Sequence, residues 1–191
     1  MAEEPHDDTV ARLRATAHPL RLRILSLLTA EAMSAAEVAR ALATTHANAS
    51  YHLRVLHDNG VLVVESEEKI RGGVAKRYRY DPERELPHQD NTNDEQIAYA
   101  RANAVEVERR LLDAASGAGF SFDLEAWVPV AAWHRALDLL DEASLLLHSE
   151  ARPTGTADTV HVSGTAQAFT MSGGLTGADV KWNRVARGGA R

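Results

Sequence analysis

The sequence predicts an α+β fold that is mainly α, with an N-terminal winged helix-turn-helix, then a long helix, then a smaller C-terminal strand–helix–strand region. A short helix, a three-residue connection and a longer helix are followed by two strand-like segments, which is the element order of a winged helix. Beyond them come a helical apolar stripe and a segment of alternating apolar residues. We expect the boundaries 1–82, 83–93 for a polar linker, 94–171 for the second region and 172–191 for a Gly-rich disordered tail.

Helical spacing and proline place the first two helices. One is expected from Asp7 to Thr16, after an acidic start that suits a helix N-terminus. A second begins at Pro19, a residue suited to the first turn of a helix. Its apolar stripe at i, i+4, i+7 and i+8 indicates one buried face, formed by Leu20, Ile24, Leu27 and Leu28.

Capping residues place the next two helices. Ser34 and Glu37 have the spacing of a capping box, which predicts a short helix with Val38 and Leu42 facing inward. After the connection 43–45, Thr45 is expected to cap a longer helix. That helix runs from His46 to about Asn59 and ends at Gly60, the residue type expected just beyond a helix C-terminus.

The longer helix divides into two faces when its residues are projected at 100° each. The core face holds Ala49, Leu53 and Leu56, with His52 packed at its edge. The outward face holds Ala47, Tyr51, Arg54 and Asp58, and its flanks hold Asn48 and Ser50. Phenol, guanidinium, hydroxyl and amide groups can bind phosphates or base edges in a major groove. The alternative is a polar helix face that is only solvated.

A hairpin with a basic tip follows. Residues 61–66 and 76–80 are expected to be strands, and Gly72-Gly73 marks the turn between them. Residues 1–82 carry 11 basic and 11 acidic side chains, so the net charge of −6 comes from residues 83–191. Within the hairpin, the run from Lys69 to Arg79 holds five basic residues and no acid. This run predicts a positive wing, unless it is only a solvated basic loop.

Several of these strings, in order, resemble the ArsR-type winged helix-turn-helix repressors. Residues 17–25 (AHPLRLRIL) resemble the opening of that family, 45–62 resemble its recognition helix and first strand, and 77–80 (RYRY) resemble the return strand of its wing. The resemblance covers about residues 8–82 and implies a homodimeric DNA-binding transcription regulator, often a repressor that an inducer releases. The residues then expected to contact DNA are Thr45, His46, Ala47, Asn48, Ser50, Tyr51, Arg54, Lys69, Arg71, Lys76, Arg77 and Arg79.

Metal and cofactor sites are not expected. The chain has no cysteine, the ligand that the best-known metal sensors of this family use, and the helix expected from Asp94 to Ser116 has no histidine. His134, Asp138 and Asp141 at i, i+4 and i+7 could hold a divalent metal, but three polar residues on one helix face are more often solvated. We therefore predict neither a metal nor a cofactor.

The second region is expected to serve assembly. The helix from Asp94 carries an apolar stripe and is predicted to dimerise the chain, unless it packs on its own domain. Residues 120–128 and 159–171 are expected to be strands on either side of a helix that runs from Pro129 to about Glu150. Their large apolar residues either form a core or line an effector pocket: Phe120, Phe122, Trp127, Trp133, Phe169 and Met171.

The function expected from these observations is a sequence-specific DNA-binding transcription regulator. It would be a homodimeric repressor on an inverted-repeat operator, with double-stranded DNA, a second copy and an unknown small-molecule effector as partners. The alternative is a winged-helix module for protein interaction. We do not expect an enzyme, because the chain has no nucleophile motif, phosphate loop or strong carboxylate pair. The lack of an apolar leader, membrane span and cysteine predicts a cytoplasmic protein without membrane contact.

Overall fold

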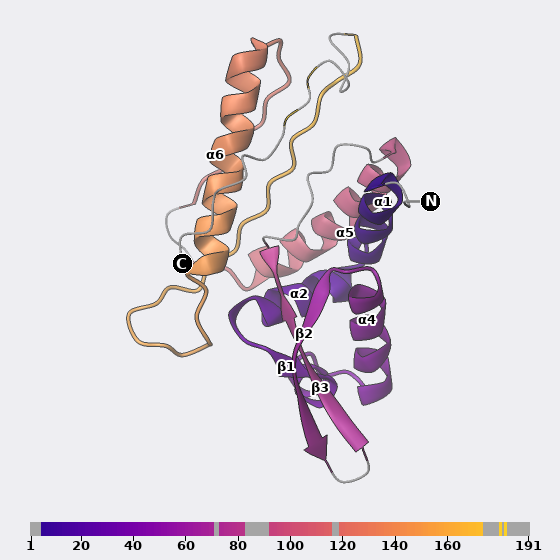
Figure 1. The fold of residues 1–191 in the computed structure, drawn as a ribbon. Helices are drawn as coiled ribbons and strands as arrows, with labels where there is room; N and C mark the ends of the chain where they lie inside the picture. The colour runs from indigo at the N-terminus through magenta and orange to yellow at the C-terminus, as the bar shows by residue number, and fades with distance from the viewer. Residues whose placement is uncertain are drawn as a thin grey trace, which may run out of the picture.

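The structure is a computed structural model that describes residues 5–70, 73–82, 92–115, 119–173, 180 and 182. It confirms the predicted fold class, a mainly helical α+β chain with an N-terminal helix-turn-helix (Figure 1). Its elements in chain order are α1 (Pro5–Thr16), α2 (Pro19–Ala30), β1 (Met33–Ser34), α3 (Ala35–Ala41), α4 (His46–Asp58), β2 (Leu62–Ile70), β3 (Gly73–Tyr80), α5 (Asn93–Leu112) and α6 (Val130–Ser149).

The sheet has three antiparallel strands in the order β1-β3-β2. β2 and β3 form the predicted hairpin, with Leu62 opposite Tyr80 and Ile70 opposite Gly73, so both strands are longer than expected. The register shifts between Val64 and Ser66, which indicates a β-bulge there. The two-residue strand β1 is too short to leave an alternating pattern, and the sequence analysis missed it.

The core of the winged helix lies between α2, α3, α4 and the sheet. Its fully buried side chains come from each helix, namely Ile24 and Leu28, Val38, and Ala49, Leu53 and Leu56. The sheet contributes Leu62 and Tyr80. The three residues predicted to face inward from α4 are all buried, so the apolar period of this helix was interpreted correctly.

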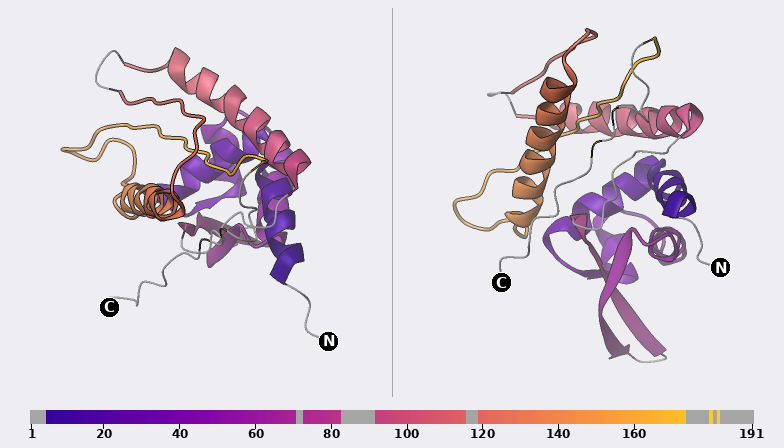
Figure 2. Two further views of the ribbon diagram at one scale, coloured as in Figure 1. Left: turned by 90° about the horizontal axis from the view of Figure 1, so that it is seen from above. Right: turned by 45° about the horizontal axis from the view of Figure 1, so that its top comes forward.

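Helix α5 packs across α1 and α2 of its own chain (Figure 2). It begins one residue earlier than expected, with a capping box of Thr92 and Glu95 that the sequence analysis missed. Glu95 is buried and pairs with Arg14 of α1, whose Nε lies 2.8 Å from Oε1. Glu106 is also buried and accepts a hydrogen bond from Arg109. The opposite face leaves Ile97, Val105, Leu111 and Leu112 exposed.

The C-terminal region differs from the prediction. Helix α6 lies where it was expected, but the two predicted strands are wrong, since residues 119–129 and 159–171 form no strand. A strand needs a neighbour to take up its backbone hydrogen bonds, and neither segment pairs with another described segment. Five of the six residues proposed for a core or an effector pocket are exposed, and only Trp133 is half-buried. Within this chain they form neither a closed core nor an enclosed pocket.

None of the helices in the described residues has the length and apolar character needed for a membrane span. The linker predicted at 83–93 falls largely outside the described residues, and so does most of the tail predicted at 172–191.

Candidate nucleic-acid interface

The connection between α3 and α4 is held by local hydrogen bonds. Ser34 and Glu37 form the predicted capping box at the start of α3. Thr45 caps α4 as predicted, its side-chain oxygen accepting from the Asn48 backbone N–H at 3.1 Å. Between the helices, Ala43 takes a left-handed conformation with φ 50°. This tight turn directs α4 across α3, and an alanine there is strained.

Helix α4 presents the face that the projection predicts. Tyr51 is 56% exposed, and Arg54 is exposed on the next turn. Thr45, His46 and Ala47 are exposed around the N-terminus of the helix, and Asn48 and Ser50 are half-buried at its flanks. The Asn48 amide donates to Thr44 Oγ1 at 2.9 Å, so part of its hydrogen-bonding capacity is used within the turn. The exposed groups include donors and acceptors suited to base edges and phosphates.

Two histidines and an arginine lie close together on the side of α4 away from its exposed face. The rings of His52 on α4 and His18, the N-cap of α2, lie 4.9 Å apart, and His18 Nδ1 accepts from the Leu20 N–H. His52 is buried, and its Nδ1 has no hydrogen-bond partner. Burial lowers the pKa of both histidines, and the nearby Arg21 charge lowers them further. The position of His52 at the core edge follows from the helical period, but nothing in the sequence pattern indicates His18 as its neighbour.

The wing is less positive than the acid-free run suggested. In the hairpin register, acidic residues of β2 lie opposite the basic residues of β3. Lys76 Nζ lies 3.9 Å from Glu67 Oε1, and Arg79 donates to Glu65 Oε1 at 3.2 Å. Lys69 is exposed near the tip, and Arg71 lies outside the described residues. The prediction of a positive wing counted only the charges between Lys69 and Arg79. Pairing the two strands of the hairpin would have revealed the acidic residues on the opposite strand.

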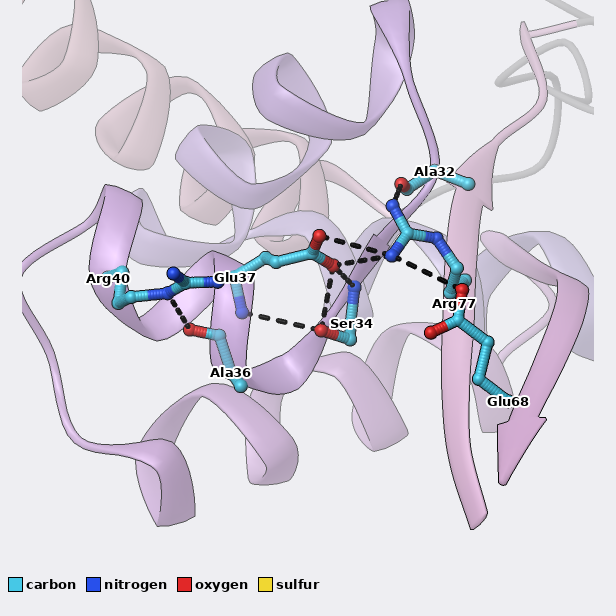
Figure 3. A network of polar contacts seen from close by, with 7 residues as sticks. All are labelled: Ala32, Ser34, Ala36, Glu37, Arg40, Glu68 and Arg77. Atoms are coloured by element: carbon cyan, nitrogen blue, oxygen red, sulfur yellow. Dashed lines mark hydrogen bonds and ion pairs between the residues drawn. The ribbon is translucent and has the colours of Figure 1, made fainter. Parts of the chain in front are cut away.

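Arg77 is engaged inside the protein (Figure 3). Its side chain is only 24% exposed. Its guanidinium donates to both carboxylate oxygens of Glu37, at 3.1 and 2.9 Å, and to the carbonyl oxygen of Ala32 at 2.6 Å. The backbone hydrogen bond from Ser34 is the largest effect that lowers the pKa of Glu37, and Arg77 lowers it further. Arg77 therefore ties the wing to the start of α3, a role that the sequence alone did not indicate.

Comparison with known proteins identifies one domain. Residues 16–65 match a protein-family model described as a helix-turn-helix domain. The chain carries a helix-turn-helix domain. The match spans α2 to the first half of β2, including the exposed face of α4, and supports a DNA-binding regulator in general. No curated protein matches the sequence.

Outside the helix-turn-helix domain, the polar residues considered for a metal do not form a ligand set. No group of three or more His, Cys, Asp or Glu residues among the described residues could hold a metal ion. Of the three residues on α6, Asp138 accepts a hydrogen bond from Trp182 Nε1 at 2.9 Å. The expectation that the protein uses no metal stays a prediction.

Proposed function

We propose that the protein is a sequence-specific transcription regulator of the ArsR-like winged-helix type that binds double-stranded DNA. The observation that carries the proposal is the exposed polar face of α4. Tyr51 and Arg54 are exposed on this face. The β2–β3 hairpin projects away from α5 and α6 (Figures 1 and 2). A helix with such a face fits the width of a major groove. That it is not an enzyme is part of the same proposal.

On DNA, α4 would lie in the major groove with Arg54 and Tyr51 toward the base edges. Arg54 can make a bidentate contact to guanine. Contacts around the helix N-terminus come from Thr45, His46, Ala47, Asn48 and Ser50. At the wing, Lys69 and Lys76 are the cations proposed to contact the DNA backbone. Arg71 lies outside the described residues, and its contact with DNA is proposed from the sequence alone. Arg77 and Arg79 are engaged with acids and contribute less to this interface.

We further propose a homodimer that binds an inverted repeat and represses transcription. The stripe left exposed on α5 by its packing on α1 and α2 supports a two-fold contact between copies. Two α4 helices would then enter successive major grooves, about 34 Å apart. An effector that changes this spacing would release the DNA.

The alternative function is a winged-helix module for protein interaction. The observation that favours it is the pairing of the wing's cations with Glu65, Glu67 and Glu68, which reduces the positive charge available to phosphates. The exposed face of α4 would then contact a protein.

Selection of bound fragments from a genomic DNA library, followed by mobility shift, tests the proposal. The full chain is expected to enrich fragments that share an inverted repeat. The Lys69→Ala, Lys76→Ala double variant should weaken binding to selected and random DNA equally. Its salt slope should be shallower by up to about two for each wing that contacts DNA. If no fragment is enriched and no duplex shifts at low salt, the protein-interaction function replaces this proposal.

A further inference from the structure

The region from residue 119 to residue 173 has no interior of its own. None of its residues is buried, although it contains a helix of twenty residues and many large apolar side chains. Phe120 is 89% exposed, Trp127 is 83% exposed and Val160 is 79% exposed. Soluble monomers seldom expose contiguous apolar patches larger than a few hundred Å². This region therefore lacks a partner surface in the isolated chain.

The exposed side chains of the region show how large that partner surface could be. Twelve large apolar residues between 119 and 173 are exposed, each by 47% or more. A standard specific interface takes about 800 Å² from each partner, and one buried aromatic side chain contributes about 150–250 Å². The apolar side chains of this region can therefore form the centre of such an interface.

The alternating apolar pattern of the extended segments indicates which kind of structure they would form with a partner. In residues 120–128, one side of an extended chain carries Phe120, Phe122, Leu124, Ala126 and Val128, and the other side carries mainly polar residues. Such a segment suits a sheet with one face on a helix layer and the other in water. One chain offers only two such segments, and a two-stranded sheet is marginally stable at best. Two chains offer four strands and two copies of α6.

We propose that residues 119–171 complete their fold with the same residues of a second copy, as an intermolecular sheet covered by the two α6 helices. Each copy brings the elements that the other lacks: strands with an apolar face and a helix with no buried side chain. This interface is separate from the stripe on α5, and it would hold the proposed dimer together at a second point.

The charge of the region argues against other occupants. Residues 119–173 contain seven acidic and two basic residues. Nucleic acid and anionic membranes would be repelled by this excess of negative charge. The winged helix covers little of the region, because α6 lies away from α4 and from the tip of the hairpin (Figure 1). Its link to the sheet is local, as in the ring contact of His148 with Tyr80 at 5.7 Å.

Tryptophan fluorescence tests the proposal in the full chain. The Trp127→Phe, Trp182→Phe variant leaves Trp133 as the sole tryptophan, half-buried on the helix α6 that would cover the sheet. As the copies associate, Trp133 emission should shift to the blue and acrylamide quenching should fall. Light scattering should show the mass rising from 20.8 kDa to twice that value over the same concentration range. A dimer in which Trp133 is quenched as much as in the monomer, or a monomer in which it is already fully protected, would overturn the proposal.

A pair of variants tests the proposal if the dimer does not dissociate at concentrations that can be measured. Phe122→Asp places a charge on the apolar side of the segment, and Ser121→Asp places the same charge on the polar side. In the same single-tryptophan background, Phe122→Asp should raise the quenching of Trp133 and weaken the dimer, and Ser121→Asp should do neither. Equal effects of the two changes would contradict the proposal. Far-UV circular dichroism checks that the winged helix stays folded, and failure of DNA binding alone would leave this result standing.

Discussion

The winged helix and the region from 119 to 173 contain apolar residues in equally regular patterns, but only the first buries them. In the winged helix, helices joined by short connections fold back on one sheet, and Ile24, Leu53 and Leu56 become fully buried. In the second region, α6 has an apolar stripe, but none of its residues is fully buried. A periodic pattern thus predicts that a face will be covered, and the covering surface must come from elsewhere in the same chain or from another chain.

The sharpest difference between the regions is expected in their response to cavity formation. Leu53 is fully buried and Leu124 is 68% exposed. Leu53→Ala should lower the free energy of unfolding by about 2–5 kcal/mol. Leu124→Ala should change it by less than about 0.5 kcal/mol at concentrations where the chain is monomeric. Three tyrosines lie in the winged helix and Tyr99 lies on α5, which packs on it, whereas all three tryptophans follow residue 126. Near-UV tyrosine signals therefore report on the winged helix and α5 and not on residues 119–173. Equal losses in the two variants would remove the distinction.

Within the winged helix, two neighbouring arginines of β3 should differ in the same way. Arg77 makes three hydrogen bonds to Glu37 and Ala32, and Arg79 makes an exposed pair with Glu65. Arg77→Ala should cost about 1–3 kcal/mol of folding stability, since charge-assisted bonds are lost. Arg79→Ala should cost about 0–1 kcal/mol. Urea unfolding measures both, and a larger loss for Arg79→Ala would contradict the assignment of Arg77 as the anchor of the wing.

Acid should destabilise the winged helix through His18 and His52. Burial lowers the pKa of each below the ordinary value of 6.5, so the unfolded chain binds more protons than the folded one. Their contribution to stability is therefore complete above about pH 6.5 and is lost as the pH falls below it. His52→Gln should flatten this dependence between about pH 7 and pH 5. His161→Gln is the matched control, because residue 161 lies outside the winged helix; a dependence that His52→Gln leaves unchanged would exclude this explanation.

The smallest effect concerns backbone strain, of which each region has one non-glycine case among the described residues. Ala43 in the helix-turn-helix connection has φ 50°, and Asp158 near the C-terminal segment has φ 57°. Ala43→Gly should raise the stability of the winged helix by about 0.5–1 kcal/mol, because glycine adopts this conformation without a Cβ clash. Asp158→Gly should leave the tyrosine transition unchanged. A thermal midpoint lowered by Ala43→Gly would mean that the entropy cost of glycine outweighs the strain.

Local signals explain how much of the fold was predictable from the sequence. The capping box at Ser34, the Thr45 cap and the apolar period of α4 each depend on a few adjacent residues, and each prediction was confirmed. The outward positions of Tyr51 and Arg54 follow from the same period. The features that the sequence did not predict depend on residues distant in the chain. Examples are the acidic residues of β2 opposite the basic run and the contacts of Arg77 with Ala32 and Glu37.

The two strands predicted in the C-terminal region failed for the same physical reason. Alternation in residues 120–128 describes a face that suits a sheet, but strand formation also needs a hydrogen-bonded neighbour. The isolated chain does not provide that neighbour within the described residues. The proposed second copy would supply it.

The central claim, that α4 reads DNA, is tested most directly with two exposed arginines, one from each region. Arg54 lies on the outward face of α4 and Arg135 on α6. With DNA selected by the full chain, Arg54→Ala should weaken binding by about 1–3 kcal/mol, and it should weaken binding to random DNA much less. Arg135→Ala should change neither affinity. Equal losses on both DNAs would show that Arg54 contacts only phosphate, and unchanged affinity for selected DNA would contradict the claim that α4 is the recognition helix.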